Sequence, residues 1–222
     1  MAQEALTFDM YGTLVNPIRI WQHLDQWIAQ DTQRIADIWR QKQLEYTFRL
    51  TAMEQYQDFE QVTRRALDYA LAATKHELTD EQKQQLMGQY NKLEVFPDVL
   101  EGLQKLQQKG HTMVVFSNGT PTMLRTLMQS AKLNAYLSGF ISVDEVRTYK
   151  PAPRTYQLVS QKLGRPLNEI RLISSNPFDV TGSISAGMQA TWIDRSGGIF
   201  DTLGPRPTMV VKTLVELADR LG

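Results

Sequence analysis

Four short segments concentrate the side chains that could do chemistry: two carboxylates, an ammonium group, and several hydroxyls and amides. They are Asp9-Met10-Tyr11-Gly12-Thr13, Ser117-Asn118-Gly119-Thr120, Thr148-Tyr149-Lys150-Pro151 and Ser174–Asp179. A carboxylate can act as a nucleophile, and a neighbouring lysine keeps it ionised. Taken alone, each residue also has an ordinary role: Asp9 in a turn, Lys150 in solvent, Asp179 at a helix start.

These segments fall where strands are expected to end. Six apolar runs alternate with helical patterns, at residues 5–8, 112–116, 140–143, 171–174, 190–193 and 209–211. The alternation predicts an α/β fold with a Rossmann-like open parallel sheet and helices on both faces. Such sheets bind ligands beyond the carboxyl ends of their strands, so we expect the four segments to meet at one edge.

A helical insertion is expected after the first strand. Residues 18–96 hold one glycine, Gly88, and no proline, which favours long helices. Apolar residues recur at helical spacing from Phe59 to Ala73, and Thr79 with Gln82 has the form of a capping box. We therefore predict a helical cap at residues 16–95, inserted into a core formed by residues 1–15 and 96–222.

The overall composition argues against several kinds of function. The chain has 222 residues, with 24 Lys and Arg against 24 Asp and Glu, so nothing favours nucleic acid or an anionic membrane as partner. It has no cysteine, and its three histidines show no metal-ligand spacing. No apolar run approaches the roughly 18 residues of a membrane span, and we expect a cytoplasmic protein.

The four segments, together with the stretch Trp39–Thr47, resemble the motifs of the haloacid dehalogenase superfamily, and more narrowly those of its L-2-haloacid dehalogenases. The resemblance spans nearly the whole chain. It implies hydrolysis of short L-2-haloalkanoic acids to D-2-hydroxy acids and halide, through an ester on Asp9 and without a cofactor. It also implies a homodimer.

The resemblance implies a role for each matching residue. The catalytic set it implies is Asp9, Thr13, Arg40, Ser117, Lys150, Tyr156, Ser174, Asn176 and Asp179. The implied substrate and halide contacts are Met10, Tyr11, Arg40, Gln41, Leu44, Phe59, Ser117, Asn118 and Phe178. Within these sets, Lys150 would hold Asp9 ionised and Arg40 would receive the halide.

Two alternatives remain open. One is a magnesium-dependent phosphatase of the same superfamily. Such phosphatases carry a D-x-D motif at the first strand, whereas here Tyr11 stands two residues after Asp9. Asp9 and Asp179 alone offer few hard oxygen ligands for a divalent cation, which favours a metal-free site. A catalytically inactive binding protein with this fold is the second alternative, and only a measurement of activity separates it.

Overall fold

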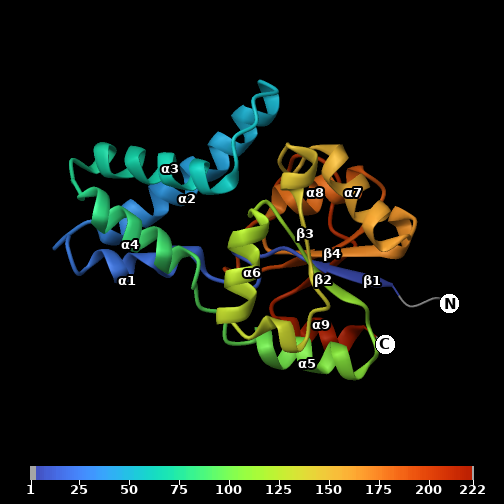
Figure 1. Ribbon diagram of the computed structural model, residues 1–222. Coiled ribbons are helices and arrows are strands. Elements are labelled where there is room, and N and C mark those ends of the chain that lie inside the picture. Colours follow the sequence, from blue (N-terminus) through green and yellow to red (C-terminus); the bar gives the residue numbers. More distant parts are fainter. Residues whose placement is uncertain (1–3, 222) are drawn as a thin grey trace.

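A six-stranded parallel sheet forms the centre of the protein, whose computed structural model describes residues 4–221 (Figure 1). The strands are β1 (Ala5–Phe8), β2 (Met113–Ser117), β3 (Phe140–Ser142), β4 (Ile170–Ser174), β5 (Gln189–Ile193) and β6 (Met209–Val211), and they lie in the order β3-β2-β1-β4-β5-β6. The α/β prediction is confirmed. Every residue of β1, β2 and β4 is buried, as expected for strands covered on both faces.

Helices cover both faces of the sheet. Figure 1 shows α7 and α8 on one face and α5 and α9 on the other. Their bounds, with that of α6, are α5 (Val99–Gln108), α6 (Pro121–Ser130), α7 (Pro153–Leu163), α8 (Pro177–Ser185) and α9 (Leu214–Arg220). Single 3-10 turns connect some of these elements, at Leu133–Ala135, Val143–Val146 and Leu167–Glu169.

The helical cap follows β1 and lies to one side of the sheet (Figure 1). It consists of a 3-10 turn, Pro17–Ile20, and the helices α1 (Trp21–Leu24), α2 (Thr32–Ala52), α3 (Phe59–Thr74) and α4 (Asp80–Tyr90). The capping box predicted at Thr79 and Gln82 opens α4, with both of its hydrogen bonds formed. The predicted core range 1–15 begins with residues 1–3, which lie outside the described residues, as does residue 222.

Most predicted strands differ from the observed ones by a residue. β2 begins and ends one residue later than the apolar run 112–116, and β4 and β5 each begin one residue earlier than expected. The alternation did not indicate α9, because its seven residues present only two helical turns. No helix between residues 4 and 221 is both long and apolar enough to cross a membrane.

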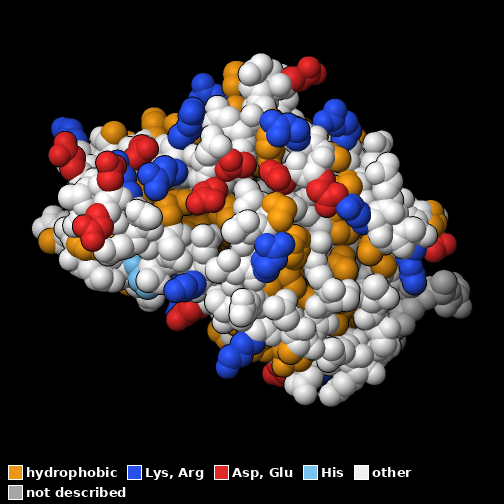
Figure 2. Space-filling model, in the orientation of Figure 1, with side chains coloured by type: hydrophobic (Ala, Val, Ile, Leu, Met, Phe, Trp, Pro, Cys, Tyr) orange, Lys and Arg blue, Asp and Glu red, His pale blue; other side chains and the backbone are white. Residues whose placement is uncertain are grey.

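Charged side chains of both signs are interspersed over the face of the molecule in Figure 2. This mixture matches the equal numbers of acidic and basic residues in the sequence. On that face, electrostatic attraction would favour no single sign of macromolecular partner.

Candidate active site

Asp9 lies directly after β1, in a turn that folds back onto its carboxylate. Gly12 has φ +92°, a conformation that side chains with Cβ rarely adopt, so glycine suits this turn. The turn brings Thr13 into reach, and its Oγ1 donates a hydrogen bond of 2.9 Å to Asp9 Oδ2. The same Oγ1 accepts from the backbone N–H of Ser175, at 2.8 Å, and so ties the turn to the end of β4.

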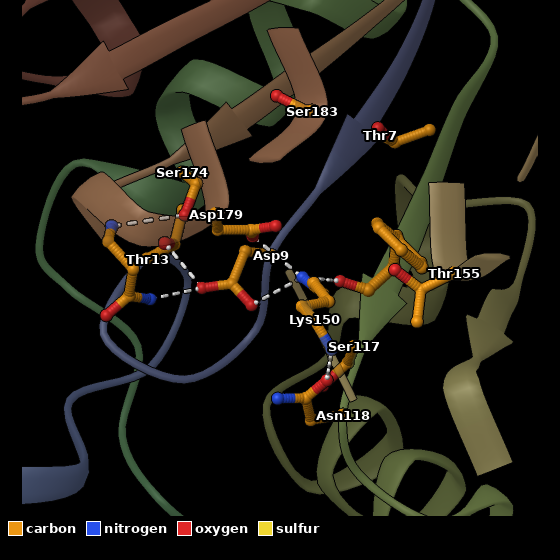
Figure 3. A network of polar contacts seen from close by, with 12 residues as sticks. Thr7, Asp9, Thr13, Ser117, Asn118, Lys150, Thr155, Ser174, Asp179 and Ser183 are labelled. Atoms are coloured by element: carbon orange, nitrogen blue, oxygen red, sulfur yellow. Dashed lines mark hydrogen bonds and ion pairs between the residues drawn. The ribbon is translucent and has the colours of Figure 1, made fainter. Parts of the chain in front are cut away.

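Lys150 reaches Asp9 from the loop before α7, and its ammonium group is fully surrounded by acceptors (Figure 3). Lys150 Nζ lies 3.1 Å from Asp9 Oδ1, 2.8 Å from Asp179 Oδ2 and 2.8 Å from the carbonyl oxygen of Phe116. It also lies 4.3 Å from the centroid of the Phe116 ring. Its backbone N–H donates to Asn118 Oδ1 at 3.1 Å, which fixes the loop against the end of β2.

The segment after β4 completes the surroundings of the nucleophile. Asn176 Nδ2 donates to Asp9 Oδ2 at 2.7 Å and to the carbonyl oxygen of Tyr11 at 3.0 Å. Ser174 Oγ accepts from the backbone N–H of Asn176 at 3.1 Å, which orients that segment. The Asp9 carboxylate therefore accepts hydrogen bonds from Lys150, Thr13 and Asn176, and this geometry holds it in one orientation.

Asp179 is buried at the start of α8, between a cation and a phenol. Its Oδ1 accepts from the Tyr156 hydroxyl at 2.9 Å, and its Oδ2 accepts from Lys150. Burial raises the pKa of Asp179 to about 6, although Lys150 acts in the opposite direction. Burial also lowers the pKa of Lys150, but attraction to Asp179 and Asp9 outweighs it, and the net shift is upward. Lys150 is therefore charged at neutral pH.

Arg40 extends from α2 of the cap toward the same edge of the sheet. Its Nη2 donates to the carbonyl oxygen of Tyr11 at 3.1 Å and lies 3.4 Å from Asn176 Oδ1. A single pocket between cap and core brings these groups together, lined by Asp9, Tyr11, Arg40, Leu44, Phe59, Asn118, Lys150, Asn176 and Phe178. The pocket thus combines two cations, one carboxylate and four apolar or aromatic side chains.

The aromatic wall of this pocket is built from both parts of the chain. The Tyr11 ring packs on Phe59 of α3, with centroids 5.3 Å apart, and on Tyr90 of α4 at 5.5 Å. Phe178 meets Phe48 of α2 edge-on at 5.1 Å. Burial raises the pKa of the Tyr11 hydroxyl well above 10, so this residue stays neutral at physiological pH.

Seven of the predicted residues do not line the pocket: Met10, Thr13, Gln41, Ser117, Tyr156, Ser174 and Asp179. Gln41 is exposed. Met10 is buried, and its carbonyl oxygen accepts from the N–H groups of the turn. Ser117, buried at the end of β2, accepts from the N–H of Gly119 at 3.2 Å. Ser174 therefore supports Asn176, which lines the pocket, and Tyr156 supports Asp179, which contacts Lys150.

Sequence reasoning missed Gln43, which is fully buried and contacts Arg40 directly. Its position three residues after Arg40 on α2 was the available signal, because side chains three apart share a helix face. It also missed the carbonyl oxygen of Phe116 as a partner of Lys150. Every residue has a backbone carbonyl, so the residue types in a sequence do not indicate which one will accept a hydrogen bond.

Lys150 places its positive charge between the two carboxylates. Its Nζ is within 3.1 Å of both Asp9 and Asp179. Among residues 4–221, no cluster of three His, Asp or Glu side chains could hold a metal ion. The groups that contact the Asp9 carboxylate are the Lys150 ammonium, the Thr13 hydroxyl and the Asn176 amide.

Comparison with known proteins agrees with this geometry. Residues 3–187 match the haloacid dehalogenase-like hydrolase family. The chain is 35% identical over 211 residues to haloacetate dehalogenase H-2 of Moraxella sp. (strain B), covering 95% of this chain and 94% of that one. It is 36% identical to (S)-2-haloacid dehalogenase 4A of Burkholderia cepacia, covering 87% of this chain and 84% of the other.

A solved structure shows the same fold over the whole chain. The L-2-haloacid dehalogenase of Xanthobacter autotrophicus, with chloropropionic acid covalently bound, superposes with a TM-score of 0.90 at 31% identity, covering 98% of each chain. The protein described here belongs to the haloacid dehalogenase-like hydrolases. Relatives named (S)-2-haloacid dehalogenase or haloacetate dehalogenase match over most of its length.

Proposed function

We propose that this protein hydrolyses short L-2-haloalkanoic acids to D-2-hydroxy acids and halide. The observation that carries the proposal is the Asp9 carboxylate, held by Lys150, Thr13 and Asn176 at the floor of a pocket whose other cation is Arg40. The relative from Xanthobacter autotrophicus, with chloropropionic acid covalently bound, supports a covalent route.

The reaction divides into two displacements. An Asp9 oxygen attacks C2 of the substrate, a carbon–oxygen bond forms, and the halide leaves with the bonding electron pair, which inverts C2. Water then attacks the carboxyl carbon of the Asp9 ester, releases the 2-hydroxy acid and regenerates the carboxylate, with one proton going to solvent. Asp179, with Lys150 and Tyr156 around it, is the group we assign to orient and activate that water.

Charge explains the need for two cations. Nucleophile and substrate are both anions, and two unit charges about 4 Å apart repel by about 4 kcal/mol at an effective dielectric near 20. Lys150 offsets the charge of Asp9, and Arg40 faces the departing halide, with Asn118 and Phe178 beside it. Tyr11, Leu44 and Phe59 exclude water from the alkyl side, which makes the carboxylate a better nucleophile.

A single-turnover experiment in oxygen-18 water tests the route. With enzyme in excess over L-2-chloropropionate, we expect label in Asp9 and none in the first D-lactate released, and Asp9→Asn should release no chloride. Direct incorporation of label into lactate would contradict the ester. The activity should persist in EDTA, whereas magnesium-dependent release of phosphate from phosphate esters would support the phosphatase instead.

We further propose the domain bounds, assembly and compartment. Residues 16–95 form the cap and the remainder forms the core, because the antiparallel bridge between Val15 and Val95 brings the two connections together. The assembly is a homodimer, an expectation from the family resemblance that sedimentation velocity would test. The absence of cysteine fits the reducing cytoplasm, which fractionation of the source cells would test.

A further inference from the structure

A buried chain of side chains in the cap leads from α3 and α4 to the Arg40 guanidinium. Gln43 Oε1 accepts from Arg40 Nη1 at 2.8 Å and from the Tyr90 hydroxyl at 3.1 Å. Gln43 Nε2 donates to Thr63 Oγ1 at 2.7 Å. Gln43 and Thr63 are both fully buried, and Tyr90 is nearly so.

Thr63 determines which way the Gln43 amide faces. Its single hydroxyl proton is used in a 2.6 Å hydrogen bond to the carbonyl oxygen of Phe59, so toward Gln43 its oxygen can only accept. Gln43 must therefore turn its NH₂ group to Thr63 and its oxygen to Arg40. The opposite orientation would bring two acceptors together at Thr63 and two donors together at Arg40, a costly arrangement in a buried site.

Tyr90 is fixed by packing in the same network. Its ring lies 5.3 Å from that of Trp39 and 5.5 Å from that of Tyr11. The Trp39 indole N–H in turn donates to the backbone carbonyl of Thr63 at 2.7 Å. Because burial raises the pKa of Tyr90, its hydroxyl stays a donor to Gln43. Both groups that contact the Gln43 oxygen, the Arg40 guanidinium and the Tyr90 hydroxyl, are therefore hydrogen-bond donors.

We propose that Gln43, oriented by Thr63 and Tyr90, is a positioning residue that pre-sets Arg40 to receive the departing halide. The proposal rests on the dehalogenase function proposed above. An arginine side chain loses up to about 2 kcal/mol of rotamer entropy when it is ordered. Because Gln43 holds Arg40, this entropy is lost when the protein folds and not during the reaction. The N–H donors of the guanidinium are then in place before negative charge develops on the halogen.

This role predicts a loss that depends on the leaving group. Chloride is the poorer leaving group and carries more concentrated charge than bromide, so its departure depends more on Arg40. Gln43→Leu should lower kcat/KM for 2-chloropropionate by about 10–100-fold, below the roughly 10²–10³-fold cost of losing a direct donor. The loss with 2-bromopropionate should be several-fold smaller, and inhibition by added bromide should weaken.

Two threonines of α3 supply a matched pair of variants. Thr63 and Thr74 each donate to the carbonyl oxygen four residues earlier, and both are buried, but only Thr63 accepts from Gln43. Thr63→Val should reproduce the leaving-group-dependent loss, because the amide can then turn over. Thr74→Val should leave the ratio of chloro to bromo activity at the wild-type value.

The outcomes separate this inference from the proposed function. If wild type releases no halide from either substrate, the dehalogenase function itself fails. If wild type is active and the Gln43 and Thr63 variants slow both substrates equally, or leave halide inhibition unchanged, the positioning role is overturned. Should Gln43→Leu not fold, Thr63→Val and Tyr90→Phe test the same role, because each removes one of the other two contacts of Gln43. The chloro to bromo activity ratio is then compared with that of wild type.

Discussion

At the scale of single residues, the site depends on a lysine in an unusual position. Lys150 is 1% exposed, yet it contacts two carboxylates and a backbone carbonyl. Removing one partner of a buried ion pair costs about 3–5 kcal/mol, because the charge left behind is uncompensated. The structure avoids that cost by giving each of the three charged groups a partner, and the contact with Lys150 also helps to orient the Asp9 carboxylate.

The pKa of Asp179 predicts how activity depends on pH. Its ionised form accepts hydrogen bonds from Lys150 and Tyr156, and burial places its pKa at about 6. Below that pH the carboxyl binds a proton and these bonds are lost, so kcat/KM should fall about tenfold per pH unit as pH drops below 6. Rates measured from pH 5 to 8 check this, and a flat profile would contradict it.

Tyr156→Phe is the control for this assignment. The Tyr156 hydrogen bond lowers the pKa of Asp179 by stabilising the carboxylate. Without the hydroxyl, Asp179 should protonate at a higher pH, and the acid side of the profile should move upward. A profile that does not move would assign the titration to a different group.

At the scale of elements, the contact between α7 and α8 positions Tyr156 and Asp179. Gly182 of α8 makes this contact possible, because a Cβ there would lie 2.5 Å from Pro151 Cβ and 2.6 Å from the Tyr156 hydroxyl. Both distances are shorter than real Cβ contacts allow. The glycine therefore lets α8 approach the residue that follows Lys150.

Two glycine substitutions should have opposite effects on stability. Gly182→Ala should destabilise the protein by about 1–3 kcal/mol through overpacking, although alanine favours helices by about 1 kcal/mol. It should also lower activity, because Tyr156 and Asp179 must shift. Gly88→Ala in α4, where a Cβ would meet nothing within 4 Å, should stabilise by about 0.5–1 kcal/mol. Urea unfolding of both variants measures the change in the free energy of unfolding. A change of the same sign in both variants would refute the packing argument.

At the scale of the whole molecule, Arg195 joins the sheet to the connection between cap and core. Its Nη1 lies 2.7 Å from Asp98 Oδ1, and its Nη2 donates to the carbonyl oxygen of Thr13 at 2.7 Å. The guanidinium also packs 4.0 Å over the Phe96 ring. A residue just after β5 thus holds both the turn that carries Asp9 and the chain that returns from the cap.

Arg195→Met should reveal how much this contact contributes. The variant loses a largely buried charged hydrogen bond, and it leaves Asp98 and the Thr13 carbonyl without this partner. We expect the free energy of unfolding to fall by about 3 kcal/mol. Arg19→Met is the control, because Arg19 pairs with Glu94 at 2.7 Å in the same region but with both side chains mostly exposed. Its urea midpoint should stay at the wild-type value. Equal shifts of the urea midpoint in the two variants would show that the Arg195 contact stabilises the protein no more than the exposed Arg19 pair does.

The sequence by itself determined the class of fold and the position of each reactive segment along the chain. Strand runs and turns are local patterns, and in a parallel sheet with helical crossovers the carboxyl ends of the strands share one edge. Asp9, Asn118, Lys150 and Asn176 could therefore be placed together before any coordinate was known. The family motifs then pointed to Arg40 on the cap.

Only the tertiary structure decided which side of each cap helix faces that edge. Gln41 and Gln43 lie two residues apart on α2, which is about 200° around a helix, so at most one of them can face the site. Gln41, the residue that the sequence indicated, is exposed, whereas Gln43 lies inward, against Thr63 and Tyr90. The angle at which the cap sits on the core depends on packing between distant segments, and no local pattern of residues carries that information.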